Sequence, residues 1–220
     1  MKKAILYISI FCSSFIAFSQ DDLQFFISLN GNLYMPINSQ RLTYPILGYD
    51  KDADPKVLVG GFGVGFSAVK EWKERLLIKG QANFSRHAYW DEPLEVKDVN
   101  NNPLGMYIGK SVDYVLGTTA TIQFRPSEKI GLGAGLGGDF MLLSVYDFSG
   151  FAGADAQKTR NKNYKFFTPV LPLEVSFYLN KILINIRYEQ GLVNRYKKPL
   201  ADYEKENYGL LVFEFGYRLR

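Results

Sequence analysis

Three glycines in the segment GLGAGLGGDF, residues 131–140, have the spacing of a dinucleotide-binding loop. Gly133-x-Gly135-x-x-Gly138 matches the G-x-G-x-x-G fingerprint, and Asp155 lies near the offset of roughly 20 positions at which an acidic residue binds the ribose. That chemistry needs a helix N-terminus directly after the glycines. Here the glycines alternate with apolar residues in period two, and the segment continues as a strand. We therefore interpret them as places where a bulky side chain comes close or a barrel bends.

Ser85 and His87 are a nucleophile and a base on one face of one predicted strand, near its outer end. A catalytic Ser-His pair needs a third group that orients the imidazole, and the sequence assigns none. We expect no catalytic residues and treat Ser85, His87 and Asp113 as a candidate polar site at the rim. His87 is the only histidine, and Cys12 is the only cysteine. A Cys/His zinc site is therefore close to excluded, and no metal or cofactor is expected.

The first 19 residues have the features of a secretory signal peptide. Lys2 and Lys3 precede an apolar run, and Ala17-Phe18-Ser19 places small residues at the −3 and −1 positions for cleavage. The predicted mature chain, residues 20–220, forms one domain and lacks cysteine, so its fold cannot depend on disulfides. Removing two of 26 basic residues leaves 24 against 22 acidic ones, a net charge of +2, which does not indicate a nucleic-acid partner.

Almost the whole predicted mature chain alternates between apolar and polar residues with period two, which is typical of half-buried β-strands. In the first such segment, Phe25, Ile27 and Leu29 lie on one face, and Ser28 and Asn30 on the other. No window has the apolar repeat of a capped helix. The pattern predicts an all-β protein with eight strands, at residues 23–35, 57–69, 76–89, 111–124, 130–143, 166–179, 182–192 and 208–219.

The predicted connections alternate strictly in length. Long segments at 36–56, 91–110, 147–165 and 194–207 alternate with short turns at 70–75, 126–129 and 180–181. Transmembrane β-barrels have this asymmetry, with brief periplasmic turns and long external loops. Both termini fall on the short-turn side. Aromatic residues at the strand ends predict two interfacial girdles: Trp90, Tyr107, Tyr146, Tyr164, Tyr196 and Tyr208 near the long loops, and Trp72, Phe177 and Tyr217 near the short turns.

With these features, the sequence resembles the small eight-stranded outer-membrane barrels of the OmpX-like and PorT-like kind. The resemblance covers the predicted mature chain and includes the closing strand YGLLVFEFGYRLR. It implies an antiparallel up-and-down transmembrane barrel in the bacterial outer membrane with both termini periplasmic, inserted by the barrel-assembly machinery. The chain departs from this family at its end, where Arg218-Leu219-Arg220 replaces the usual terminal aromatic residue. A soluble lipocalin-like barrel is the structural alternative, and the glycine-rich polar faces argue against it.

Eight strands leave an interior only wide enough for side chains, so a general diffusion pore is not expected. Lys79, Glu174, Arg187 and Glu214 lie near mid-strand on the polar faces, where buried charges must be paired. We expect Arg187 to lie between Glu174 and Glu214, with Lys79 reaching the cluster from the third strand. Together with Tyr34 and Tyr178, these residues should fill the interior as a plug. A proton or ion path is the alternative.

The function indicated is that of a non-enzymatic barrel acting through its long loops, in adhesion, surface protection or assembly with a larger export or uptake complex. The resembling families include lipid A-modifying enzymes, which leaves catalysis as an alternative. Outer-membrane lipid and lipopolysaccharide are the expected surroundings and partners. The basic loop segments KTRNKNYK and RYKKP could bind such anionic groups or a partner protein; their candidate residues are Lys158, Arg160, Lys162, Arg195, Lys197 and Lys198.

Overall fold

The computed structural model describes residues 23–37, 58–90, 94–97, 100, 102–149, 157–160, 162, 164–195, 197 and 207–219. The predicted signal peptide and the segment 38–57 lie outside these residues. The described chain is all strand and turn. Its ten strands are β1 Leu23–Ile37, β2 Leu58–Lys73, β3 Leu76–Trp90, β4 Leu94–Lys97, β5 Pro103–Ser127, β6 Ile130–Ser149, β7 Gln157–Arg160, β8 Phe167–Leu179, β9 Ile182–Gly191 and β10 Asn207–Arg218.

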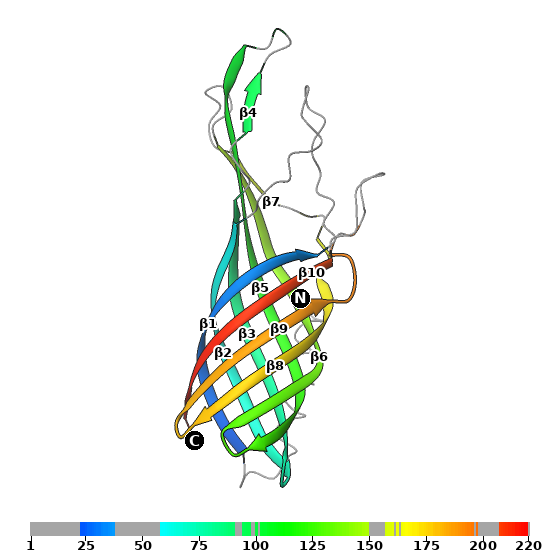
Figure 1. Cartoon of the computed structure of the whole chain (residues 1–220). Helices are drawn as coiled ribbons and strands as arrows, with labels where there is room; N and C mark the ends of the chain where they lie inside the picture. Colours follow the sequence, from blue (N-terminus) through cyan, green and yellow to red (C-terminus); the bar gives the residue numbers. More distant parts are fainter. Residues whose placement is uncertain are drawn as a thin grey trace.

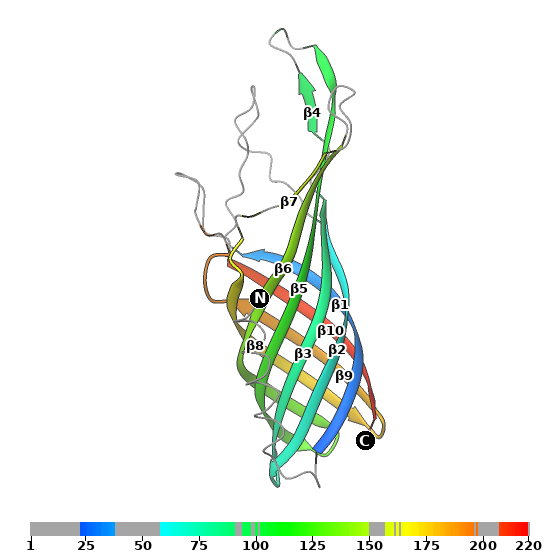
Figure 2. The same cartoon turned by 180° about the vertical axis from the view of Figure 1, so that it is seen from behind.

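Eight of these strands close into an antiparallel up-and-down barrel (Figures 1 and 2). Each barrel strand pairs with its neighbours in the chain, and β1 pairs with β10 to complete the ring, with Asn30 opposite Glu214. The predicted fold class is therefore confirmed. The backbone N–H of Leu219 also donates to Phe25 O at 2.8 Å, so the two ends of the described chain meet where the short turns lie. Among the described residues, no helix is long and apolar enough to span a membrane.

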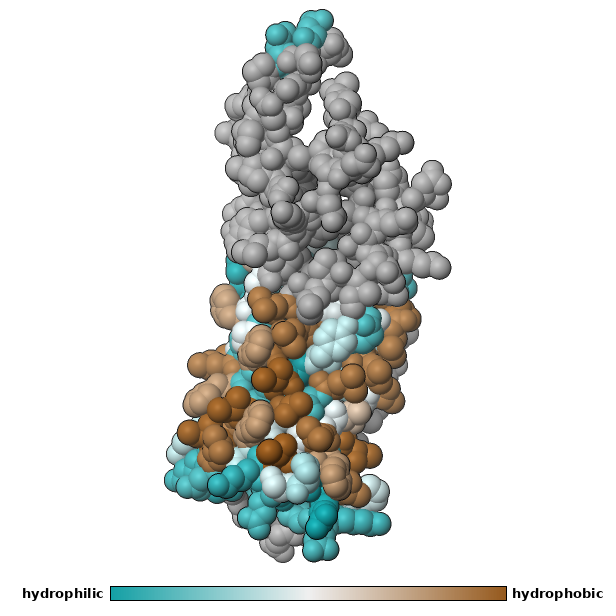
Figure 3. Space-filling view, in the orientation of Figure 1, coloured by the Kyte–Doolittle hydropathy of each residue, from teal (hydrophilic) through white to brown (hydrophobic). Residues whose placement is uncertain are grey.

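The barrel has a polar inside and an apolar outside. On β1, Ser28 and Asn30 are 3% and 4% exposed, whereas Ile27 and Leu29 are 53% and 66% exposed. The same alternation around the ring produces a broad apolar belt above a hydrophilic end (Figure 3). A soluble barrel would bury the apolar face, so the lipocalin alternative is wrong. A barrel whose outer surface contacts lipid has apolar side chains outside and polar side chains inside, which is the arrangement seen here.

Two long hairpins extend beyond the barrel, where the sequence predicted loops. β5 begins at Pro103 rather than near 111, and β6 continues to Ser149 rather than ending near 143. The short strands β4 and β7 pair with these extensions, and Figure 1 shows them projecting from the end opposite the short turns. In the extension of β5, Leu104, Met106 and Ile108 alternate with Gly105, Tyr107 and Gly109, so a period-two signal was present that the loop prediction missed.

The glycines of the apparent nucleotide fingerprint lie inside β6, and this strand continues past them to Ser149. A Cβ at Gly133 would lie 2.8 Å from Gln123 Cγ and 3.0 Å from Glu174 Cγ. On β2, a Cβ at Gly61 would lie 2.8 Å from His87 Cδ2. These glycines therefore make room for polar side chains that cross the interior, as the sequence predicted, and the nucleotide hypothesis is excluded.

Two local features of β8 are explained by its residues: an interruption in its pairing with β6, and the tight turn that connects it to β9. The ladder between β6 and β8 pairs Ala134 with Leu173 and resumes only at Gly137 with Val170. Pro172 lies in this gap. Proline has no N–H to donate to a neighbouring strand, so the ladder is interrupted there. The two-residue turn between β8 and β9 places Asn180 at φ 54°, a conformation that asparagine tolerates better than most residues.

Candidate functional site: the charged interior and the outer mouth

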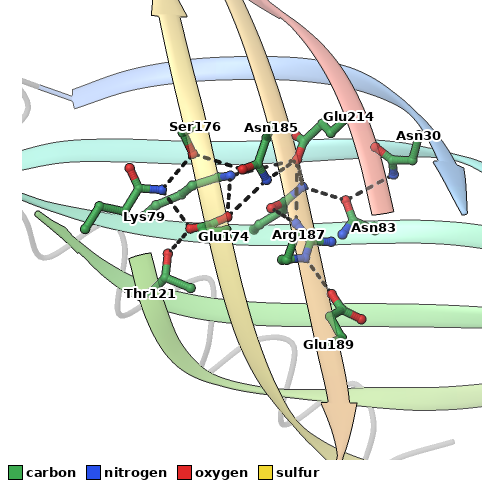
Figure 4. A network of polar contacts seen from close by, with 12 residues as sticks. Asn30, Lys79, Asn83, Thr121, Glu174, Ser176, Asn185, Arg187, Glu189 and Glu214 are labelled. Carbon is green, nitrogen blue, oxygen red and sulfur yellow. Dashed lines mark hydrogen bonds and ion pairs between the residues drawn. The ribbon is translucent and has the colours of Figure 1, made fainter. Parts of the chain in front are cut away.

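Four charged side chains meet near the middle of the barrel (Figure 4). Each comes from a different strand: Lys79 from β3, Glu174 from β8, Arg187 from β9 and Glu214 from β10. They face inward because their sequence neighbours are apolar and face the belt. None of the four is more than 5% exposed. The structure thus brings together all four residues that the sequence predicted as an interior charge network.

Negatively and positively charged side chains alternate across the barrel. Lys79 Nζ lies 3.0 Å from Glu174 Oε2 and 3.8 Å from Glu214 Oε2. Arg187 Nη1 lies 3.6 Å from the same Glu214 oxygen, and Arg187 Nε donates to Glu189 Oε1 at 2.6 Å. The sequence predicted Arg187 between Glu174 and Glu214, but the ion pair of Glu174 runs to Lys79. Glu189 takes the expected place of Glu174 beside Arg187.

Neutral side chains complete the hydrogen bonding of Glu174. Its Oε1 accepts from Gln123 Nε2 at 2.7 Å and from the Thr121 hydroxyl, while Oε2 accepts from Lys79 and from Asn185 Nδ2 at 3.0 Å. A buried carboxylate with this many donors is far less costly than an isolated one. These four donors compensate for the burial of the Glu174 carboxylate.

Glutamine and asparagine side chains also join the charged groups: Gln81 links Arg187 to Glu214, and Asn185 donates to both Glu174 and Glu214. Gln81 Nε2 donates to Glu214 Oε2 at 2.7 Å, and Arg187 Nη1 donates to Gln81 Oε1. Asn185 Nδ2 reaches Glu214 Oε2 at 3.1 Å, and Asn30 Nδ2 reaches Asn83 Oδ1 at 3.3 Å. These amides are absent from the predicted network, which was based on charged residues alone. Their positions on the same inward faces were the available signal.

The candidate rim site lies nearer the outer end of the barrel. Ser85 and His87 are 7% and 5% exposed, and Asp113 lies opposite His87 in the pairing of β3 with β5. Asn32 Nδ2 lies 3.2 Å from His87 Nε2, so one ring nitrogen of His87 already has a hydrogen-bond partner in the wall. A void of about 10 Å³ next to these residues is large enough for one water only. The geometry resembles a hydrogen-bonded wall more than a substrate pocket.

Arg195 does not lie with the exposed basic residues, as the sequence predicted, but is buried in the outer mouth. Its Nη2 lies 3.3 Å from Asp113 Oδ2, and its guanidinium stacks 5.0 Å from the ring centre of Tyr164. The N–H of Lys165 donates to Arg195 O at 2.6 Å. The connection after β9 is thus joined to the connection before β8 and to the barrel wall.

The other basic candidates have different placements. Arg160, Lys162 and Lys197 are exposed, and Lys197 Nζ donates to Lys162 O at 2.9 Å. Lys158 lies on β7 opposite Asp147, and Lys198 lies outside the described residues. Of the predicted girdle residues, Trp72 and Tyr217 are exposed at the short-turn end, whereas Tyr164 is half-buried under Arg195. In the part of the chain that the structure describes, no group of His, Cys, Asp or Glu could hold a metal ion.

A closed antiparallel barrel with an ion-paired inside and an apolar outside defines a small transmembrane β-barrel, as the resemblance predicted. Among solved structures, the chain is similar to Ail of Yersinia pestis, solved with the heparin analogue sucrose octasulfate, at 14% identity and TM-score 0.46, covering 90% of this chain and 99% of Ail. It is also similar to Neisserial surface protein A at 11% identity and TM-score 0.44, covering 88% and 96%.

The outer membrane protein OprG of Pseudomonas aeruginosa is similar at 12% identity and TM-score 0.34, covering 90% of this chain and 96% of OprG. No protein-family model matches the chain, and neither does any curated protein. These likenesses assign no function, which has to be inferred from the residues of the chain itself.

Proposed function

We propose that the protein is a non-enzymatic outer-membrane barrel that acts through its external loops while its interior stays closed. The observation that carries the proposal is the polar network across the barrel axis. Six of the eight barrel strands contribute side chains to it, and the other two, β2 and β6, contribute inward glycines that make room for them. Such an interior holds the barrel shut rather than conducting solutes.

Planar-bilayer recording tests the closed interior. The purified protein should insert without producing a stable wide channel, because the network fills the cross-section at Lys79 and Arg187. A reproducible nanosiemens conductance would contradict the closed interior and favour a porin role. Insertion itself is checked separately. The protein should fractionate with the outer membrane, resist carbonate washing and migrate faster on a gel before boiling than after it.

The proposed orientation places the short turns in the periplasm and the projecting hairpins outside the cell. It follows from the general asymmetry of loop lengths in transmembrane barrels. The predicted mature chain has no cysteine, so single cysteines report the orientation directly. Lys162→Cys should react with a membrane-impermeant maleimide on intact cells, and Lys129→Cys only after permeabilisation. The reverse pattern would invert the proposed topology.

The exposed basic residues of the outer end are the proposed binding surface. Lys162 and Lys197 lie on the connections that the buried Arg195 joins to the barrel wall, and Arg160 ends the neighbouring strand β7. Anionic groups of lipopolysaccharide fit this surface. Replacing the three residues with glutamine should weaken lipopolysaccharide binding in a salt-dependent manner. The matched triple change of Lys73, Arg75 and Lys181 at the short turns should leave it unchanged.

Membership of a larger export or uptake complex is a separate part of the proposal. Purification from the native membrane in mild detergent, followed by identification of co-purifying proteins, tests it. A partner that is lost in the outer triple variant but kept in the short-turn triple variant would place the contact on the external loops. A chain that always purifies alone, also after cross-linking, would argue for independent action.

A further inference from the structure

A cavity of about 300 Å³ lies at the short-turn end of the barrel, and we call it the vestibule. This volume is at the lower limit of ordinary small-molecule sites. Exposed residues of the turns form part of its wall, so it reaches the surface at that end. Its lining is Gln24, Val69, Glu71, Leu77, Arg125, Glu128, Lys129, Tyr178, Asn180 and Arg218.

The inner end of the vestibule is apolar and closed. Val69 and Leu77 are 3% and 5% exposed and belong to a buried cluster with Phe26 and Leu183, against which Tyr178 packs. Tyr178 and Phe26 make an edge-to-face contact with ring centres 6.3 Å apart. The Tyr178 hydroxyl donates to Gln123 Oε1 at 2.7 Å, away from the apolar residues. The vestibule is thus a blind pocket beneath the charged network and not the start of a channel.

Two guanidinium groups in the vestibule wall have donor capacity left over. Arg125 Nη2 donates to Glu128 O at 2.5 Å, but its Nη1 contact with Glu71 is long, at 3.4 Å, and its buried Nε has no hydrogen-bond partner. Arg218 Nη1 reaches Gln24 Oε1 only at 3.5 Å. A guanidinium offers five donors in a planar fork that matches carboxylate and phosphate oxygens.

The surroundings of the vestibule are positively charged. Among the described residues of the short-turn end, basic side chains outnumber acidic ones. The basic residues are Lys70, Lys73, Arg75, Arg125, Lys129, Lys181 and Arg218, and the acidic residues are Glu71, Glu74 and Glu128. A concave site under one sign of charge raises the local concentration of ions of the opposite sign. Both the contacts and the wider charge therefore favour an anion.

We propose that the vestibule binds a small organic anion, namely a carboxylate or phosphate group attached to a compact apolar body. Arg125 and Arg218 hold the anionic group, and the apolar body packs on Leu77, Val69 and the Tyr178 ring. This site is distinct from the basic outer surface and lies at the opposite end of the barrel. In the proposed orientation it faces the periplasm, although the binding does not depend on that orientation.

Calorimetric titration of the folded protein in phosphatidylcholine nanodiscs tests the site with four probes. Phenylacetate and phenyl phosphate carry both required features, whereas benzyl alcohol lacks the charge and inorganic phosphate lacks the apolar body. At least one of the first two should bind saturably, and which of them binds tighter identifies the anionic group. Benzyl alcohol and inorganic phosphate should bind at least tenfold more weakly.

The variants Arg125→Gln and Arg218→Gln should each weaken binding of the better probe at least tenfold. Arg75→Gln removes the same charge from an adjacent turn outside the vestibule lining and should change binding less than twofold. If Arg125→Gln does not fold, as judged by gel migration before boiling, Arg218→Gln alone decides. Absence of saturable binding, or equal losses in Arg75→Gln and Arg218→Gln, would overturn the site without affecting the closed interior or the outer surface.

Discussion

Replacing Arg187 with leucine should destabilise the barrel strongly. Arg187 is 1% exposed. Its Nε lies 2.6 Å from Glu189 Oε1, and its Nη1 lies 3.6 Å from Glu214 Oε2, which also has Lys79 as a neighbouring cation. Without it, Glu214 keeps hydrogen bonds from Gln81 and Asn185, but Glu189 loses its charge partner. Removing one partner of a buried ion pair typically costs about 3 to 5 kcal/mol, because the remaining charge stays buried.

Urea titration of the protein folded in phospholipid vesicles measures the loss. With a slope of about 2 kcal/mol per M urea, typical of small proteins, the unfolding midpoint of Arg187→Leu should fall by roughly 2 M. The matched control is Arg160→Leu, since Arg160 is exposed on β7. A surface change of that kind should alter the free energy of unfolding by less than about 0.5 kcal/mol.

A rescue experiment separates lost charge pairing from lost packing. The structure selects Glu189→Gln and Glu214→Gln as partners for Arg187→Leu, because these two carboxylates contact Arg187 while Glu174 pairs with Lys79. The triple variant should recover much of the lost midpoint. If Arg187→Leu unfolds at the same urea concentration as Arg160→Leu, Arg187 does not lie in a paired, water-excluded interior and the assigned inner face of β9 is wrong.

Further changes test the belt, the glycines and the outer mouth. Leu29→Arg, in the middle of the apolar belt, should cost about 2 to 4 kcal/mol in vesicle unfolding, and Leu219→Arg at the barrel end much less; equal costs would place no membrane at the belt. Gly133→Val should abolish the fast-migrating unboiled form, because its Cβ meets Gln123 and Glu174, whereas Gly31→Val has nothing within 4 Å and should fold normally. Asp113→Asn weakens the hold on Arg195 and should accelerate tryptic cleavage after Arg195, with Asp147→Asn as the control; an unchanged cleavage rate would mean that this ion pair does not hold Arg195 in place.

Much of the barrel could be predicted from the sequence, because alternating apolar and polar residues identify the two faces of each strand. The alternation around Lys79 and Arg187 was sufficient to place both side chains inside. The glycines of β2 and β6 were likewise correctly interpreted as room for neighbouring side chains. The ends of the strands were predicted less well. In the extension of β5, Leu104, Met106 and Ile108 do alternate with other residues, but Pro103, Gly105 and Gly109 are typical of loops and led to the loop prediction.

Arg195 illustrates what the sequence could not show. Its sequence context is a basic, tyrosine-containing connection, which is typical of an exposed loop. The barrel instead leaves the carboxylate of Asp113 buried at the outer mouth, and Arg195 turns inward to lie 3.3 Å from it. The vestibule escaped prediction for a related reason. Its lining comes from six strands and two turns, so no single segment of sequence reveals it.

The sequence by itself determined which side of each strand meets lipid and which side meets the interior, because the pleat of a strand is a local property with period two. Only the closed barrel decided which interior charges pair. Glu174 lies opposite Arg187 in the ladder of β8 and β9, yet its ion pair crosses the interior to Lys79 on β3. Distances across a barrel depend on how all the strands tilt and close, and no local pattern of residues encodes them.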